Sequence, residues 1–150
     1  MKLSELCHLQ SKAKMVCEKL AKEAEGIARS RYLNAQYDGD NDVSVSVVQT
    51  NKGCTVKASG KSVLFIEFGA GAKEGYAHAS LAGYAAEHGF GPGTWSDGPE
   101  GKGHWNDPKG WYIPGGGGHT YGNPPEMAMY FAAKEAKRRI PEVAREVFGT

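Results

Sequence analysis

The side chains best suited to chemistry gather between residues 69 and 123, where histidines stand among aspartates and glycines. Three of them, His104, Asp107 and His119, form the best candidate set of zinc ligands. Imidazole nitrogens and carboxylate oxygens are ordinary zinc ligands, but the helical HExxH spacing that aligns two imidazoles with a glutamate base is absent. Glycine-rich flanks would also hold ligands poorly. We therefore interpret these histidines as surface or interface residues and predict no metal site.

Glycines after an apolar run suggest a second chemistry, the cradling of a dinucleotide. Gly69, Gly71 and Gly75 approach the G-x-G-x-x-G pattern, but the third glycine comes one residue late. No helix and parallel strand with the required spacing follow. We interpret these residues as turn glycines and predict no cofactor.

Thiol chemistry is the third possibility, because Cys7, His8 and Cys17 lie close together in the sequence. A reactive thiolate needs a positioned base and an electropositive pocket, whereas these cysteines have the spacing of core positions on a helix. The aspartate-rich stretch 38–42 lacks the full ligand pattern of an EF-hand. The sequence therefore contains no catalytic set, and we predict a protein that is not an enzyme.

Length, net charge, hydropathy and cysteine content exclude further classes of function. The chain has 150 residues, the usual size of one domain, and 18 basic against 17 acidic side chains leave a net charge of only +1. Such a balance gives no overall electrostatic field that would attract nucleic acid, and we predict no direct sequence-specific nucleic-acid binding. No apolar stretch approaches the roughly 20 residues of a membrane helix, so we predict no membrane partner. Three cysteines without CxxC spacing, and no signal peptide, predict synthesis in a reducing cytoplasm.

Two long helices are predicted to form the scaffold that positions any functional side chains. Apolar residues recur three, four or seven apart over residues 3–32, and the helix is longer than a small sheet can cover, so part of its apolar stripe should serve a partner subunit. Pro124 and Pro125 open a second helix over residues 125–148, in which Pro141 predicts a kink or a break. Its buried side is predicted to hold Met127, Tyr130, Phe131, Ala133, Ile140, Val143, Ala144 and Val147.

A β-region lies between the helices. Residues 43–47 alternate apolar and polar side chains, residues 51–53 supply a turn, and residues 54–59 read as the return strand of a hairpin. The apolar run Val63–Phe68, bounded by glycines, predicts a third and central strand. Its charged residue, Glu67, either faces water or meets a partner that compensates its charge.

The stretch 70–123 follows no periodicity and is rich in glycine and tryptophan. So long a segment is uncommon in a compact domain unless it is functional or meets a partner. Tryptophan favours the partner, because one ring buries a large area with little loss of rotamer freedom. We therefore expect Trp95, Trp105, Trp111 and Tyr112 to form an interface.

Together these elements predict an α+β fold in one domain, residues 1–150. Long N-terminal and C-terminal helices (3–32 and 125–148) pack on a small, mainly antiparallel sheet (43–69), and the extended Gly/Trp-rich loop (70–123) lies between sheet and second helix.

The run VLFIEFGAG at residues 63–71 resembles a family of siphophage and prophage proteins described as minor capsid, neck or tail-completion components. Members run as a long N-terminal helix, a short β-region ending in I/V-E-F-G-T/A-G, a variable Gly- and aromatic-rich loop, and a C-terminal helix. Segments like residues 109–112 and 120–124 recur in them, and a Pro-Phe-Met-like run stands where this chain has Pro125, Glu126 and Met127. The residues that carry the motif here are Ile66, Glu67, Phe68, Gly69, Gly71, Gly122 and Pro124.

The resemblance implies a non-enzymatic structural protein of the bacteriophage or prophage head–tail junction, acting in tail completion, the neck or the connector. It implies a ring of identical subunits, with head-connector and tail proteins as partners, located in the virion neck or tail after synthesis in the host bacterial cytoplasm. A ring needs two unlike surfaces on each subunit, which the over-long helix and the tryptophan-rich loop would provide.

Two other classes stay open on the sequence. One is a metal-dependent hydrolase, such as a phage cell-wall enzyme, that uses the loop histidines; stoichiometric zinc lost on changing His104 or His119 would favour it. The other is a small binding or regulatory module of a mobile element. A gene position between head and tail-tube genes would favour assembly over that module.

Overall fold

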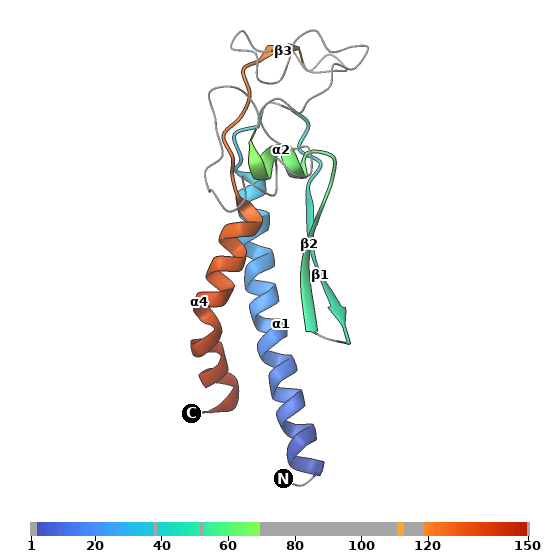
Figure 1. The fold of residues 1–150 in the computed structure, drawn as a ribbon, viewed down its shortest axis with the longest axis vertical. Helices are drawn as coiled ribbons and strands as arrows, with labels where there is room; N and C mark the ends of the chain where they lie inside the picture. Colours follow the sequence, from blue (N-terminus) through green and yellow to red (C-terminus); the bar gives the residue numbers. More distant parts are fainter. Residues whose placement is uncertain (1–2, 38, 52, 70–110, 113–118, 150) are drawn as a thin grey trace. The chain divides into compact units, whose positions relative to one another are not determined.

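The computed structural model describes residues 3–37, 39–51, 53–69, 111–112 and 119–149. Its elements in chain order are α1 (Leu3–Leu33), β1 (Ser44–Thr50), β2 (Gly53–Ser59), α2 (Val63–Phe68), β3 (Trp111–Tyr112), β4 (His119–Thr120) and α4 (Ala128–Phe148) (Figure 1). Strands β1 and β2 form one two-stranded sheet, and β3 pairs with β4 in another. The α+β class with long terminal helices and small sheets is confirmed.

The chain divides into two compact units. Unit 1 comprises Met1–Ser30, Val45–Ala58 and Ala128–Thr150, and unit 2 comprises Arg31–Ser44 and Ser59–Met127. The single domain expected for residues 1–150 stays a prediction.

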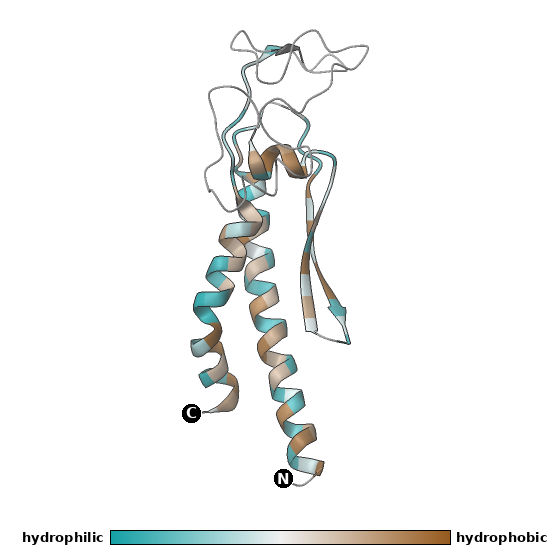
Figure 2. Ribbon diagram, in the orientation of Figure 1, coloured by the Kyte–Doolittle hydropathy of each residue, from teal (hydrophilic) through white to brown (hydrophobic). Residues whose placement is uncertain are grey.

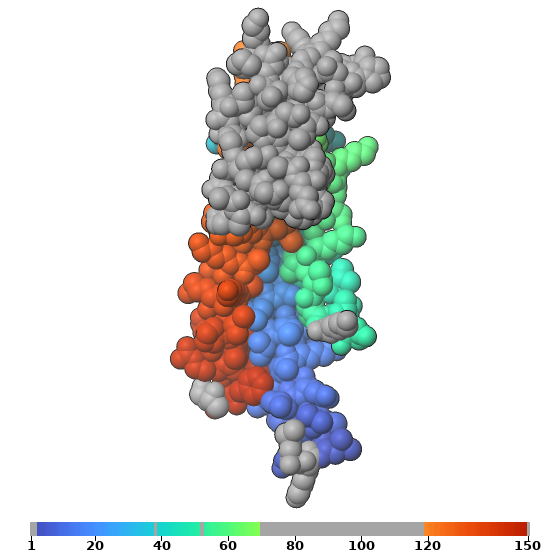
Figure 3. Space-filling model, viewed as in Figure 1, coloured from blue at the N-terminus to red at the C-terminus, as the bar shows by residue number. Residues whose placement is uncertain are grey.

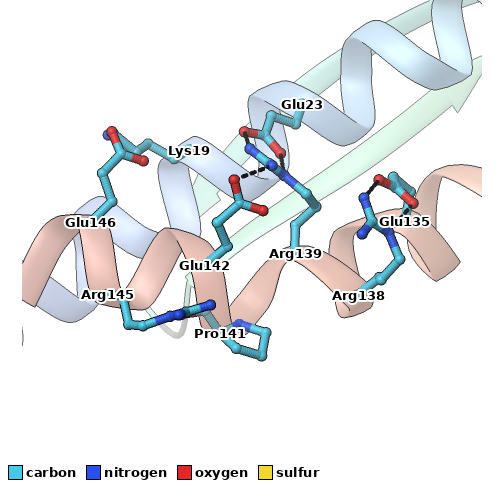
Figure 4. A network of polar contacts seen from close by, with 9 residues as sticks. All are labelled: Lys19, Glu23, Glu135, Arg138, Arg139, Pro141, Glu142, Arg145 and Glu146. Atoms are coloured by element: carbon cyan, nitrogen blue, oxygen red, sulfur yellow. Dashed lines mark hydrogen bonds and ion pairs between the residues drawn. The ribbon is translucent and has the colours of Figure 1, made fainter. Parts of the chain in front are cut away.

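In unit 1, α1 and α4 lie antiparallel, because contacts that move forward along one helix move backward along the other (Figure 4). Both helices contribute charged side chains to the seam. The joining contacts are Lys12 Nζ to the Phe148 carbonyl at 3.4 Å, Lys19 Nζ to Glu146 Oε1 at 2.6 Å, and Arg139 Nη2 to Glu23 Oε1 at 3.1 Å.

The core of unit 1 is built mainly from small residues at helical spacing. The buried positions are Ala21, Ala24 and Ala28 of α1, Val45 of β1, and Ala128, Ala132 and Val143 of α4. Alanine favours the helix and leaves room for close packing of the backbones. Phe131 and Ile140, expected on the buried side of α4, are instead 37% and 47% exposed, because the face that packs is the alanine and valine stripe.

The hairpin of β1 and β2 is confirmed, although β1 ends three residues beyond its predicted end and the other bounds differ by one residue or none. Val45 is buried between exposed neighbours, as the alternation requires, and Gly53 takes a φ of +141° at the turn. Side chains fasten β1 to α1: Arg29 Nη2 donates to the Val45 carbonyl at 2.9 Å, and Gln49 Nε2 donates to Glu18 Oε1 at 3.0 Å.

The N-terminal end of α1 extends past α4, since Lys12 already reaches the carbonyl of Phe148. Apolar positions continue to that end (Figure 2). Leu3 is 78% and Leu9 47% exposed. The expectation that Cys7 and Cys17 are core residues is wrong, because both side chains are exposed. Within the part of the chain that the structure describes, no helix combines the length and apolar character needed to cross a bilayer.

The third strand predicted over Val63–Phe68 is wrong, because these residues form helix α2. A short apolar run cannot be assigned to strand or helix by periodicity alone. Here Ile66 N donates to the Ser62 carbonyl at 3.0 Å, a helical bond, and both ends of the turn are held by residues distant in sequence, as described below.

Helix α4 begins at Ala128, three residues after the predicted start at residue 125. The backbone N–H groups of Glu126 and Met127 donate to carbonyls of α2 instead, so these residues stay outside the helix. The break considered at Pro141 does not occur, since α4 continues through it to Phe148. Pro141 is exposed.

Candidate functional site

The N-terminal side of α2 is held by a carboxylate. Asp42 Oδ2 accepts a hydrogen bond from Lys61 N at 2.8 Å, and its Oδ1 accepts one from Ser62 N at 2.9 Å. Ser62 Oγ donates to the Asp40 carbonyl at 2.5 Å. These backbone bonds lower the pKa of Asp42 from 3.8 to about 2, because they favour the charged carboxylate.

The C-terminal side of α2 is capped by residues 123–127. The last carbonyls of a helix lack partners within it, so they must find donors elsewhere. Asn123 Nδ2 donates to the Phe65 carbonyl at 2.9 Å. Glu126 N donates to the Ile66 carbonyl at 2.8 Å, and Met127 N donates to the Glu67 carbonyl at 3.1 Å. Three successive carbonyls of α2 are thus satisfied by one returning segment.

Gly69 ends α2 at the point where this segment passes closest. Its φ is +78°, a conformation that side chains with a Cβ rarely adopt. A Cβ added there would lie 2.8 Å from Pro125 N and 3.0 Å from the Asn123 carbonyl oxygen. The position therefore requires glycine for two independent reasons.

Apolar side chains close the same junction. Ile66 is fully buried, and Phe68 and Met127 are 7% and 3% exposed. Met127 holds a φ of 50°, which is costly for a residue with a Cβ, and its backbone bond to Glu67 keeps it there.

Glu67 is buried and accepts a hydrogen bond from the Tyr32 hydroxyl at 2.9 Å. Burial, and then the charge and hydrogen bond of Glu67, raise the pKa of Tyr32 well above its ordinary value. The phenol therefore keeps its proton at every physiological pH and acts as a fixed donor. Of the two alternatives for Glu67, exposure to water is wrong, because the side chain is buried and meets the neutral donor Tyr32.

The last turn of α1 is tied into the same junction. Arg31 Nη2 lies 3.2 Å from Glu126 Oε1 and donates to the Glu126 carbonyl at 3.1 Å. Asn41 Nδ2 donates to the Tyr32 carbonyl at 2.8 Å. We call the assembly of residues 65–69 with residues 122–127, closed by Tyr32, the motif clasp. Two of its hydrogen bonds join backbone to backbone, and Asn123 and Tyr32 add side-chain hydrogen bonds.

The clasp contains most of the residues that carry the resemblance, namely Ile66, Glu67, Phe68, Gly69, Gly122 and Pro124. Gly122 has a φ of +101° and its N–H donates to Thr120 Oγ1 at 3.0 Å. Gly71 lies outside the described residues.

The expected interface residues are placed only in part. Trp111 and Tyr112 form β3 and pair antiparallel with Thr120 and His119 of β4. Trp95 and Trp105 lie outside the described residues.

Of the zinc set, only His119 is described, exposed and 4.9 Å from the Tyr121 ring centroid. His104 and Asp107 lie outside the described residues. Among the residues that the structure describes, no group of three or more His, Cys, Asp or Glu side chains could hold a metal ion.

Sequence reasoning missed Tyr32, Asp42 and Asn123 as parts of the site. Tyr32 ends the first apolar periodicity. Asp42 lies in the Asp-rich stretch, and its bonds reach backbone N–H groups 19 and 20 residues away. Asn123 stands inside the Gly-x-Pro element and carries a side-chain donor. Comparison of the chain with family models, curated proteins and solved structures returns no match.

Proposed function

We propose that this chain is a non-enzymatic assembly protein of a tailed bacteriophage or prophage, acting at the head–tail junction in a ring of identical subunits. The observation that carries the proposal is the motif clasp. The two most specific elements of the resemblance, IEFG and Gly-x-Pro, are far apart in sequence, yet Asn123 bonds Phe65 across 58 residues. Two sequence motifs that serve one structural role are expected to lie in contact, as these two elements do.

The clasp also supports a role for the segment between the two elements. Because Gly69 approaches Asn123 and Pro125, both ends of that segment leave from one fixed base. A rigid base lowers the entropy lost when a long segment engages a partner. We propose that Trp95, Trp105 and Trp111 anchor the segment on a neighbouring subunit or on the tail.

The second surface of a ring subunit would be the N-terminal end of α1. Leu3 and Leu9 are exposed there beyond the end of α4. Closed rings use heterologous contacts, in which one patch of a subunit meets a different patch of the next. The proposed partners are therefore further copies of the chain, together with head-connector and tail proteins, and the proposed location is the virion neck or tail.

Complementation of a gene deletion tests the proposal. The wild-type gene supplied from a plasmid should restore the yield of infectious particles, and the triple variant W95A/W105A/W111A should not. Unchanged assembly and infectivity with the triple variant would remove the tryptophan anchors from the account. If deletion of the gene itself left the yield unchanged, the assembly role would be wrong, and zinc content would become the next measurement.

A further inference from the structure

The face of α1 that runs along α4 carries a heptad stripe. Its apolar residues are spaced alternately three and four apart, as in a helix that packs lengthwise on another helix: Leu6, Leu9, Ala13, Val16 and Leu20. One flank of the stripe contacts α4. Lys12 Nζ donates to the Phe148 carbonyl, and Lys19, seven residues later on the same flank, pairs with Glu146. The stripe and this flank therefore belong to the seam between the two helices.

The stripe continues beyond the point where α4 ends. Lys12 already lies at the last turn of α4, with its Nζ 5.5 Å from the Phe148 ring centroid, so residues 3–11 extend past that end. Figure 3 shows this N-terminal part of α1 projecting past the end of α4. It is about 13 Å of helix. Leu3 and Leu9 in it are 78% and 47% exposed. A second helix antiparallel to α1, continuing the line of α4, would cover it.

This end of α1 is complementary to itself in an antiparallel arrangement. When Leu6 of one copy packs on Leu9 of a second copy, two-fold symmetry also packs Leu9 of the first on Leu6 of the second. Glu5 lies seven residues before Lys12, on the same flank of the stripe. Flanking charges set the orientation of paired helices. An antiparallel pair in this register brings Glu5 of each copy to Lys12 of the other, a match that a parallel pair does not provide.

We propose that two copies of the free chain pair through residues 3–12 of α1, as an antiparallel helix pair with two-fold symmetry. The positive N-terminal end of each α1 then lies near the negative C-terminal end of the other copy's α4, which is a favourable arrangement of helix dipoles. So short a contact should bury less than about 1,200 Å², so the pair is weak and reversible.

The pair goes beyond the proposed function and does not depend on it. In the proposed ring the same exposed leucines, Leu3 and Leu9, would face a neighbouring subunit. A chain must therefore leave the pair before it joins a ring. Pairing keeps the apolar end of α1 covered in the free protein, where an exposed apolar surface favours non-specific association.

Sedimentation equilibrium of the purified full chain tests the pairing, over concentrations of about 5 to 500 µM. The wild-type chain should pass from monomer to dimer within this range. Leu9→Gln should weaken the dimer by about tenfold or more, because a symmetric pair loses the apolar contact twice. The matched control is Met15→Gln, since Met15 is 48% exposed but lies outside the stripe. Its dissociation constant should stay within about twofold of the wild-type value.

Charge reversal tests the antiparallel register. Glu5→Lys and Lys12→Glu should each weaken pairing, because each places like charges opposite one another. An equimolar mixture of the two variants recreates both opposite-charge contacts, so it should dimerise about tenfold more tightly than either variant alone. The control is a mixture of Glu5→Lys with Lys14→Glu, which makes the same change of charge away from the flank and should not restore pairing.

A wild-type chain that stays monomeric up to about 500 µM would overturn the proposal. So would an equal loss of pairing in Met15→Gln, or a mixture of the Glu5 and Lys12 variants that pairs no more tightly than each alone. These outcomes are distinct from failure of the proposed function. A monomeric chain whose gene deletion separates heads from tails would sink only the pair, and a dimeric chain with joined particles after deletion would sink only the assembly role.

Discussion

At the scale of residues, the motif clasp explains why particular side chains stand where they do. Gly69 is needed for its positive φ and for the close passage of Pro125, and Glu67 is tolerated in a buried place because Tyr32 donates to it. Neither fact follows from composition. Both follow from the meeting of two segments that are distant in sequence.

Gly69→Ala should destabilise the fold by about 1–3 kcal/mol, because it forces a Cβ into a left-handed backbone and against Pro125. The matched control is Gly26→Ala in α1, where a Cβ would meet nothing within 4 Å. That change should stabilise by about 0.5–1 kcal/mol through helix propensity. Urea unfolding midpoints of the two variants check this, and equal shifts would contradict the geometry of Gly69.

Tyr32→Phe should cost about 1–3 kcal/mol, because it removes a donor from a buried carboxylate. Combined with Glu67→Gln, the loss should be smaller than the sum of the single losses, as expected for a coupled pair. Tyr37→Phe, at a half-buried position, should change stability by less than about 0.5 kcal/mol. A double-mutant cycle in guanidinium measures the coupling; strictly additive losses would mean that the hydroxyl contributes nothing through Glu67.

The cap formed by Asp42 predicts a dependence of stability on pH. Its pKa is about 2 in the folded chain and 3.8 ordinarily, so its stabilisation is complete above pH 3.8 and is lost as the pH falls toward 2. Asp42→Asn should lower stability at neutral pH and flatten the curve between pH 4 and 2. Thermal unfolding across this range provides the check, and parallel curves for variant and wild type would contradict the cap.

At the scale of elements, the sequence predicted what periodicity controls. Both long helices and the hairpin were found because their apolar residues repeat over many positions. Helix α2 was not predicted, because the run Val63–Phe68 is too short to show a helical period. Its helical form also depends on hydrogen bonds from Asp42, Asn123 and Glu126, which lie outside the run. The start of α4 was misplaced for the same reason: Glu126 and Met127 use their N–H groups in the clasp.

Packing of α4 gives a direct test at this scale. The sequence placed both Val143 and Ile140 on the buried side, whereas only Val143 is fully buried and Ile140 is 47% exposed. Val143→Ala should therefore cost about 1–3 kcal/mol, and Ile140→Ala less than about 0.5 kcal/mol. Chemical denaturation of both variants measures the contrast, and a larger loss at Ile140 would show that the helix presents a different face.

At the scale of the whole molecule, the motif residues could be selected from the sequence, but their meeting could not. The resemblance singled out Ile66–Gly69 and Gly122–Pro124 separately, and only the fold reveals that the second segment caps the short helix that the first one ends.

Electron microscopy of lysates, after deletion of this gene from the genome that encodes it, tests the proposed assembly role most directly. An assembly role at the head–tail junction predicts filled heads and separate tails, restored to joined particles by the wild-type gene. Intact, joined particles in the deletion lysate would contradict that role.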